Sequence, residues 1–251
     1  MEFAMPAKMP IYAKMPKYAK MPKYAKMPKY AKMPRYAKMR ELVTLVIGVG
    51  CLLMAAVLPA SAHPHMWVDL QSRIVLHDDG SPSAIHQEWL FDDFFSTALI
   101  EEAGLHPDGV EAGLRQKIVE IMANLQPYDY FTLIKRDGDT LPLSLVGDVS
   151  AAIVENRVQM EFTVAIDDNV DLAVQNFSYA IFDPTYYIEM FHPEGDTIAF
   201  EGNAPADCGT WIEQPNPSAD AIALSQSASL DAKPDDTIGR LFAETVHVKC
   251  P

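Results

Sequence analysis

The segment MWVDLQSRIVL (66–76), followed by HDDGSP (77–82) and SAIHQEWL (83–90), decides the fold. Apolar and polar residues alternate along the first and third parts, which is the period of a β-strand with one buried face. The Asp-Asp-Gly-Ser sequence at 78–81 has the composition of a tight turn. We therefore expect an antiparallel hairpin of two strands, 66–76 and 83–90, as the first unit of a sheet.

Two helices are expected after this hairpin. Apolar residues recur at helical spacing from Phe91 to Leu99, and Asp92 or Asp93 stands where a helix N-cap is needed. A second amphipathic helix is predicted from about residue 108 to 125, because its apolar residues fall on one side of a helix.

The rest of the chain is predicted to hold strands and one long loop. The Pro- and Ser-rich stretch 214–229 is interpreted as a surface loop. The fold class is therefore α+β, with mainly antiparallel β-strands and two amphipathic helices in the N-terminal half of the mature chain. The expected strands cover 130–136, 141–145, 149–166 (two strands), 176–182, 186–191, 197–201, 210–213 and 245–249.

Upstream of the hairpin, residues 1–38 form a low-complexity tail. The hexapeptide Ala-Lys-Met-Pro-x-Tyr is repeated five times between residues 7 and 36. A proline in every unit prevents a continuous helix, and the units carry too little apolar surface to form a core. The tail reads either as a basic disordered arm or as upstream DNA translated from too early a start codon.

Residues 39–62 have the parts of a cleavable signal peptide. A short basic start precedes an apolar run from 42 to 57, and the small residues Ala60-Ser61-Ala62 form a cleavage site. A retained membrane anchor is the alternative, although the run is short for a span of about 20 residues. Cleavage after Ala62 would release residues 63–251 as the mature periplasmic α+β domain.

Removal of residues 1–62 would leave a strongly acidic protein. Eleven of the 20 Lys and Arg residues, but only two of the 34 Asp and Glu residues, lie in that segment, which leaves 9 basic and 32 acidic side chains and a formal net charge of −23. Such a surface repels nucleic acid and concentrates cations. We therefore expect no nucleic-acid partner.

The two cysteines of the mature domain, Cys208 and Cys250, are expected to form a disulfide. An even number of cysteines is typical of exported domains, where disulfides persist. A metal site made by this pair is the less favoured alternative, because the two residues are far apart and lack Cys-x-x-Cys spacing.

The predicted mature N-terminus, His63-Pro64-His65, is a candidate metal chelator. The free amine and the imidazole of His63 have ordinary pKa values of about 7.7–8 and about 6.5, so both can bind one cation near neutral pH. His65 lies one strand period further on and can point to the same side. Nitrogen ligands favour zinc, nickel, cobalt or copper over calcium and magnesium. A flexible, solvated end is the alternative.

Two carboxylates, Asp92 and Asp183, are candidate ligands that would complete this site. Each has a structural alternative, because Asp92 can cap a helix and Asp183, before Pro184, can start a turn. His86 and Glu88 share one face of a strand and could also complete a site, with a simple surface pair as the alternative.

Three motifs carry a resemblance to a known family: HPHMWVD (63–69), WLFDDF (89–94) and FDPTYY (182–187). On these motifs the chain resembles an uncharacterised family of bacterial periplasmic proteins that is catalogued as a periplasmic component of ABC-type transport and associated with nickel, cobalt or zinc permeases. The resemblance implies a periplasmic location and a role with divalent metal. The motif positions are His63, His65, Asp69, Asp92 and Asp183.

The leading hypothesis is a periplasmic accessory protein that captures or delivers zinc, nickel or cobalt to a membrane permease or ABC transporter. No motif of a nucleophilic, zinc-protease or nucleotide-binding enzyme occurs in the sequence, so we expect no enzymatic activity. Two alternatives stay open. One is a copper-dependent oxidative enzyme with an N-terminal histidine clamp, and the other is a metal-free structural partner of a transporter.

Overall fold

The computed structural model describes residues 43–46, 64–205, 207–227 and 237–250. The chain separates into two compact units, 1–59 and 60–251, and the first contributes one described helical turn at 43–46. The predicted tail 1–38 and His63 lie outside the described residues. Among the described residues, no helix is long and apolar enough to cross a membrane.

Sheet A, the larger of two sheets, contains the predicted hairpin. Its strand order is β5-β6-β2-β1-β8, with β9 also paired to β1; β1 is parallel to β8 and β9, and the other pairs are antiparallel. The hairpin is confirmed, since Val68 pairs with Phe91 and Ile74 with Ile85. The strands are β1 (Met66–Leu76), β2 (Pro82–Phe91), β5 (Leu143–Val154), β6 (Arg157–Ile166), β8 (Ile188–Phe191) and β9 (Ile198–Glu201).

Sheet B is smaller and wholly antiparallel, in the order β10-β11-β7-β3-β4. Its strands are β3 (Thr132–Arg136), β4 (Asp139–Thr140), β7 (Phe177–Ile181), β10 (Gly209–Glu213) and β11 (Thr245–Lys249). The α+β class with mainly antiparallel strands is therefore confirmed.

The core lies on the inner face of sheet A, which is the face turned toward sheet B. Alternate residues of β1, β2 and β6 are buried there, as a period of two requires. Trp89 is 1% exposed and packs against the rings of Phe131 and Phe162. Gln87 donates a hydrogen bond from Nε2 to Thr132 Oγ1 at 2.7 Å and so joins the two sheets. His86 and Glu88, between these inward residues, therefore lie on the outer face.

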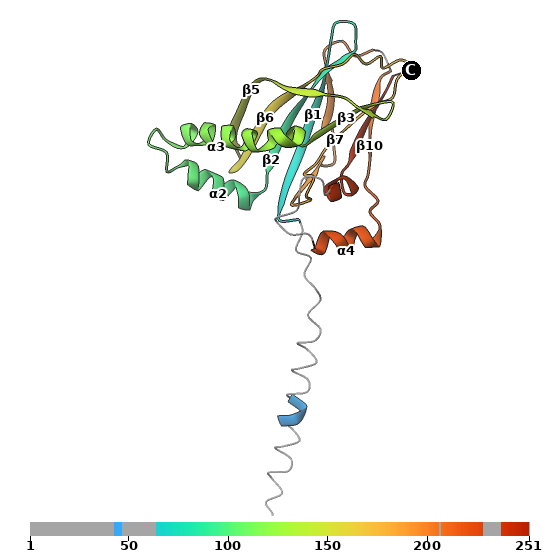
Figure 1. The fold of residues 1–251 in the computed structure, drawn as a ribbon. Helices are drawn as coiled ribbons and strands as arrows, with labels where there is room; N and C mark the ends of the chain where they lie inside the picture. Colours follow the sequence, from blue (N-terminus) through green and yellow to red (C-terminus); the bar gives the residue numbers. More distant parts are fainter. Residues whose placement is uncertain (1–42, 47–63, 206, 228–236, 251) are drawn as a thin grey trace, which may run out of the picture. The chain divides into compact units, whose positions relative to one another are not determined.

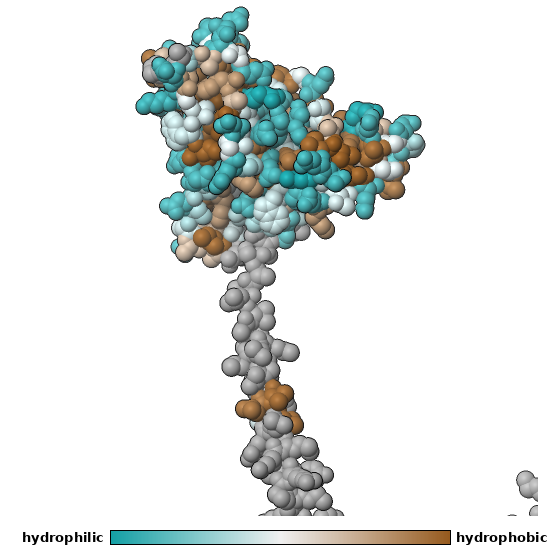
Figure 2. All heavy atoms as spheres, turned by 180° about the vertical axis from the view of Figure 1, so that it is seen from behind, coloured by the Kyte–Doolittle hydropathy of each residue, from teal (hydrophilic) through white to brown (hydrophobic). Residues whose placement is uncertain are grey.

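Helices α2 (Asp93–Ala103) and α3 (Val110–Leu125) lie side by side next to β6 and β5 (Figure 1). They approach closely at Gly113, where any side chain would collide with the backbone of Ala103. The description of both helices as amphipathic is not confirmed, because Phe94 is 86% exposed and Val119 is 70% exposed. Seen from behind, the molecule shows apolar patches on this helical region (Figure 2).

Two local predictions are wrong. The segment 126–131, expected to lead into a strand at residue 130, forms the 3-10 helix η1 (Gln126–Phe131), in which Asp129 and Tyr130 have positive φ angles. The predicted loop 214–229 contains helix α4 (Ala219–Ser227), which precedes the 3-10 helix η2 (Thr237–Leu241). Neither short helix has a long apolar stripe that would have revealed it in the sequence.

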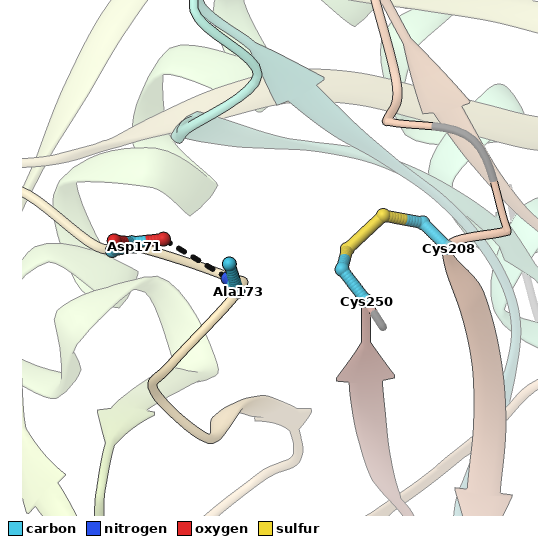
Figure 3. Close-up of a disulfide and its surroundings, with 4 residues drawn as sticks. All are labelled: Asp171, Ala173, Cys208 and Cys250. Atoms are coloured by element: carbon cyan, nitrogen blue, oxygen red, sulfur yellow. Dashed lines mark hydrogen bonds between the residues drawn. A yellow bond between two sulfur atoms is a disulfide. The ribbon is translucent and has the colours of Figure 1, made fainter.

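The predicted disulfide is present. Cys208 and Cys250 are bonded beside the paired ends of β10 and β11, as Figure 3 shows. Gly209 pairs with Lys249 directly next to the bond. The disulfide therefore joins the two ends of the chain segment that contains β10, α4 and β11.

Strand β5 is the outermost strand of sheet A and is not continuous. Its pairing with β6 shifts register between Val146 and Ser150, where Gly147 has a φ of 71°. A glycine tolerates this left-handed backbone at little cost. The pairing of β5 with β6 is therefore interrupted by a bulge.

Candidate metal centre

The structure gives Asp92 two backbone hydrogen bonds. Its Oδ1 accepts the N–H of Phe95 at 2.9 Å, which makes Asp92 the N-cap of α2, and its Oδ2 accepts the N–H of Trp67 at 2.9 Å. The cap was one of the two alternatives for this residue, and it is confirmed. Asp92 thereby connects the start of α2 to the start of β1.

Asp183 has a similar role before β8. Oδ1 accepts the N–H of Thr185 at 2.9 Å and Oδ2 accepts the N–H of Ile188 at 3.0 Å, while the hydroxyl of Thr185 lies 2.9 Å from both oxygens. Asp183 is buried, with 4% of the residue exposed. These bonds form a turn, as the alternative reading of Asp183 expected.

His65 is exposed and lies at the same end of sheet A. Its N–H donates to the carbonyl of Tyr187 at 2.9 Å, and the two rings are 4.8 Å apart between centroids. Since Met66 pairs with Ile188, the structure brings His65, Asp92 and Asp183 to the first residues of β1. Both carboxylates there bind backbone N–H groups, so the three sequence motifs join β1, α2 and β8 structurally.

A different group of side chains has the geometry of a metal site. His86 and Glu88 project from the outer face of β2, and Glu161 on β6 is the direct cross-strand partner of Glu88. One ligand atom from each of the three lies within 4.8 Å of the others. Antiparallel pairing of β2 with β6 therefore brings two carboxylates and one imidazole together.

The distances are suited to a shared cation. His86 Nε2 lies 3.8 Å from Glu88 Oε1 and 3.9 Å from Glu161 Oε2. Both distances exceed a hydrogen bond and approach the roughly 3.4 Å that separates two ligands on one tetrahedral zinc ion. The side chains are 18%, 17% and 38% exposed, respectively, so the group is partly shielded from water but still reachable.

The imidazole of His86 is oriented by a contact at its second ring nitrogen, Nδ1. Nδ1 lies 2.9 Å from Thr163 Oγ1, whereas Nε2 is buried and has no hydrogen-bond partner among the described residues. Burial, followed by the charge of Arg73, lowers the pKa of His86 below its ordinary value and favours the neutral ring. A neutral imidazole held through one nitrogen, with the other facing carboxylates, is the usual arrangement of a metal-binding histidine.

Two further side chains hold the carboxylates. Arg73 on β1 contacts Glu88 Oε1 through NH1 at 2.6 Å, and Gln159 Nε2 donates to Glu88 Oε2 at 3.1 Å and to Glu161 Oε1 at 2.9 Å. Like charges directly opposite each other on paired strands destabilise a sheet. These polar partners offset part of that repulsion.

This group and the N-terminal histidines cannot share one ion. His86 pairs with Arg73, which is eight residues beyond His65 along β1. At about 3.3 Å per residue, the two positions are about 26 Å apart. The N-terminal site therefore remains a separate prediction, and its first ligand, His63, lies outside the described residues.

A second histidine cluster lies between the sheets. His192 Nδ1 contacts Glu244 Oε2 at 2.9 Å and His192 Nε2 contacts Ser72 Oγ at 3.2 Å, in the order of a Ser-His-acid triad. However, Ser72 is 2% exposed and its hydroxyl also bonds the hydroxyl of Tyr179 at 2.7 Å. A closed hydroxyl with its hydrogen bonds satisfied has no room for a substrate, so this cluster is structural.

The sequence predicts two of the three residues of the outer cluster. His86 and Glu88 were recognisable from their shared strand face, but Glu161 was not, because nothing local shows that β6 lies beside β2. His192 follows β8 directly, and its burial beside Glu244 could not be read locally, because Glu244 is 52 residues away in the sequence.

Comparison with known proteins identifies the family. Residues 48–250 match the family described as a protein of unknown function (DUF1007), and the chain belongs to it. An uncharacterized protein of Haemophilus influenzae is 24% identical over 194 residues, covering 75% of this chain and 91% of that protein. Neither description names an activity, a ligand or a partner.

Proposed function

We propose that this member of the DUF1007 family binds one divalent transition-metal ion, namely zinc, nickel or cobalt, through His86, Glu88 and Glu161. The observation that carries the proposal is the Nε2 atom of His86, which is buried without a hydrogen-bond partner among the described residues and faces two carboxylate oxygens. A buried imidazole nitrogen without a hydrogen-bond partner beside two carboxylates is unfavourable, and a cation bound between these groups would relieve that cost.

The ligand types narrow the choice of ion. One imidazole nitrogen with two carboxylates suits zinc and its neighbours in the first transition series, whereas calcium and magnesium sites are built from oxygen alone. Thr163 would fix the ring of His86, and Gln159 would orient both carboxylates. The residues present therefore fit such an ion.

The wider role we propose is that of an exported accessory protein that captures the ion or delivers it to a membrane permease. Three observations support this: the acidic composition of residues 63–251, the disulfide, which is compatible with an oxidising compartment, and the motif resemblance to proteins associated with nickel, cobalt or zinc permeases. A half-exposed site suits an ion that is passed on, because a partner can reach it.

Calorimetric titration of the full chain with zinc, nickel and cobalt tests the proposal. The background is a His63→Ala, His65→Ala variant, so that the N-terminal histidines do not contribute. We expect one site that His86→Ala abolishes and that Glu161→Gln weakens about tenfold or more. His77→Ala is the matched control, because His77 is an exposed histidine in the β1–β2 turn.

Equal binding by the background protein and its His86→Ala derivative would contradict the assignment to this cluster. Absence of binding in both, with binding restored when His63 and His65 are present, would favour the N-terminal site instead. No binding in any form would leave the structural-partner hypothesis.

A further inference from the structure

Arg73 already contacts one of the ligand oxygens of the candidate metal centre. Its NH1 atom lies 2.6 Å from Glu88 Oε1, and this same oxygen is the one 3.8 Å from His86 Nε2. Arg73 is placed there by register, because it is the direct β1 partner of His86. A metal ion bound by His86 Nε2 and the nearest oxygen of Glu88 would therefore compete with the guanidinium for that oxygen.

The two cations would also repel each other. An arginine remains charged at any ordinary pH, and a divalent ion on Glu88 would stand within a few ångströms of it in a partly buried environment. Arg73 must therefore move away from Glu88 when the ion binds.

The carboxylate of Glu201 is a second acidic group within reach of Arg73. Glu201 on β9 has Oε2 at 3.2 Å from Arg73 Nε, yet that nitrogen makes no hydrogen bond among the described residues. β9 pairs with β1 on the side opposite β2, so Glu201 draws Arg73 away from the metal ligands. The side chain of Glu201 is 56% exposed and that of Glu88 is 17% exposed, so the guanidinium would be better solvated beside Glu201.

We infer that Arg73 is a built-in competitor of the metal ion, and that ion binding transfers its guanidinium from Glu88 to Glu201. This inference rests on the proposed metal centre. In the metal-free protein Arg73 neutralises part of the charge of the ligand carboxylates. The ion must displace Arg73 in order to bind, so the free energy of the contact between Arg73 and Glu88 is subtracted from the binding free energy of the ion. A site with such a competitor releases its ion readily, as a delivery protein requires.

The test is cobalt(II) titration of the full chain, in the His63→Ala, His65→Ala background, followed by visible absorption. Arg73→Gln should bind cobalt about tenfold more tightly at the His86-dependent site, and Glu201→Gln about fivefold less tightly, because Arg73 then stays on Glu88. In the double variant, Glu201→Gln should have no further effect. Lys249→Gln, an exposed change of the same charge on sheet B, is the control and should leave the affinity unchanged.

Unchanged or weaker binding by Arg73→Gln would overturn the inference, since Arg73 would then only position Glu88. An equal effect of Glu201→Gln with and without Arg73 would overturn the transfer to Glu201. If the wild-type sequence shows no His86-dependent cobalt site, the proposed function fails. The inference would survive that result only if Arg73→Gln gains a His86-dependent cobalt site. Absence of cobalt binding in both the parent protein and Arg73→Gln would contradict the inference. Glu201 is exposed, so its variant keeps the test valid even if Arg73→Gln folds poorly.

Discussion

His86 on the outer face of sheet A and His192 between the sheets each contact a hydroxyl group and lie beside glutamate. In the interior cluster, both ring nitrogens of His192 have partners, and Glu244 accepts the N–H of His192 and the amide of Gln214 as well. In the outer cluster, the Nε2 of His86 has none among the described residues. The same residue types thus make a completed network in one place and leave one ring nitrogen without a hydrogen-bond partner in the other.

A structural histidine differs from a candidate ligand in the number of its ring nitrogens that have hydrogen-bond partners. A buried polar atom without a partner costs free energy, so its presence calls for an explanation such as an ion. The interior cluster should therefore matter for stability, and the outer cluster for binding.

The largest expected effect is that of Glu244→Ala on stability. The change leaves the buried imidazole of His192 without its carboxylate partner, and we expect a loss of about 3–5 kcal/mol in the free energy of unfolding. Urea denaturation measures it. Glu88→Ala, in the outer cluster, should cost less than about 1 kcal/mol. Similar losses for both would erase the contrast.

The next effect is stabilisation by zinc. An ion that binds the folded state alone at 100 times its dissociation constant should raise the free energy of unfolding by about 2.7 kcal/mol. In the background lacking His63 and His65, thermal unfolding with and without zinc should show this increase, and His86→Ala should remove it. A zinc effect that is lost on Glu244→Gln but retained in His86→Ala would reverse the assignment.

A smaller effect is expected for Thr163→Val. Loss of the hydroxyl removes the partner of His86 Nδ1 while the side chain keeps its shape. We expect about a tenfold drop in metal affinity, because partners of this kind orient ligand histidines. The free energy of unfolding of the metal-free protein should fall by only about 1 kcal/mol, the usual cost of one lost hydrogen bond. A variant with wild-type affinity would show that the ring does not need this contact.

The smallest effect concerns acid. Burial alone would raise the pKa of Glu244, but hydrogen bonds from the side chain and backbone of His192 and from Gln214 hold it below its ordinary value of 4.5. The contribution of Glu244 to stability is therefore present above pH 4.5 and is lost as the pH falls through the folded-state pKa. Unfolding measured from pH 6 downward should show a steeper decline for the wild type than for Glu244→Gln. Parallel curves would contradict this.

The local parts of the fold, including the first hairpin, could be predicted from the sequence, and the pairings between strands far apart in the chain could not. Alternation in residues 66–76 revealed β1, and Asp92 was recognisable as a cap, because both signals depend on neighbours in the chain. The position of Glu161 opposite Glu88 depends on two strands that are separated by helices α2 and α3. Asp183 was ambiguous in the sequence, since an aspartate before proline begins a turn whether or not it binds a metal.

The bulge in β5 has a consequence for self-association. An uncovered strand of 12 residues at the border of a sheet is a template on which another copy of the chain can add, and such addition leads to fibres. The bulge between Val146 and Ser150 shifts the register of β5, and a bulge increases the local twist of an edge strand, which makes pairing with another strand less favourable. The bulge in β5 therefore disfavours polymerisation through this edge of sheet A.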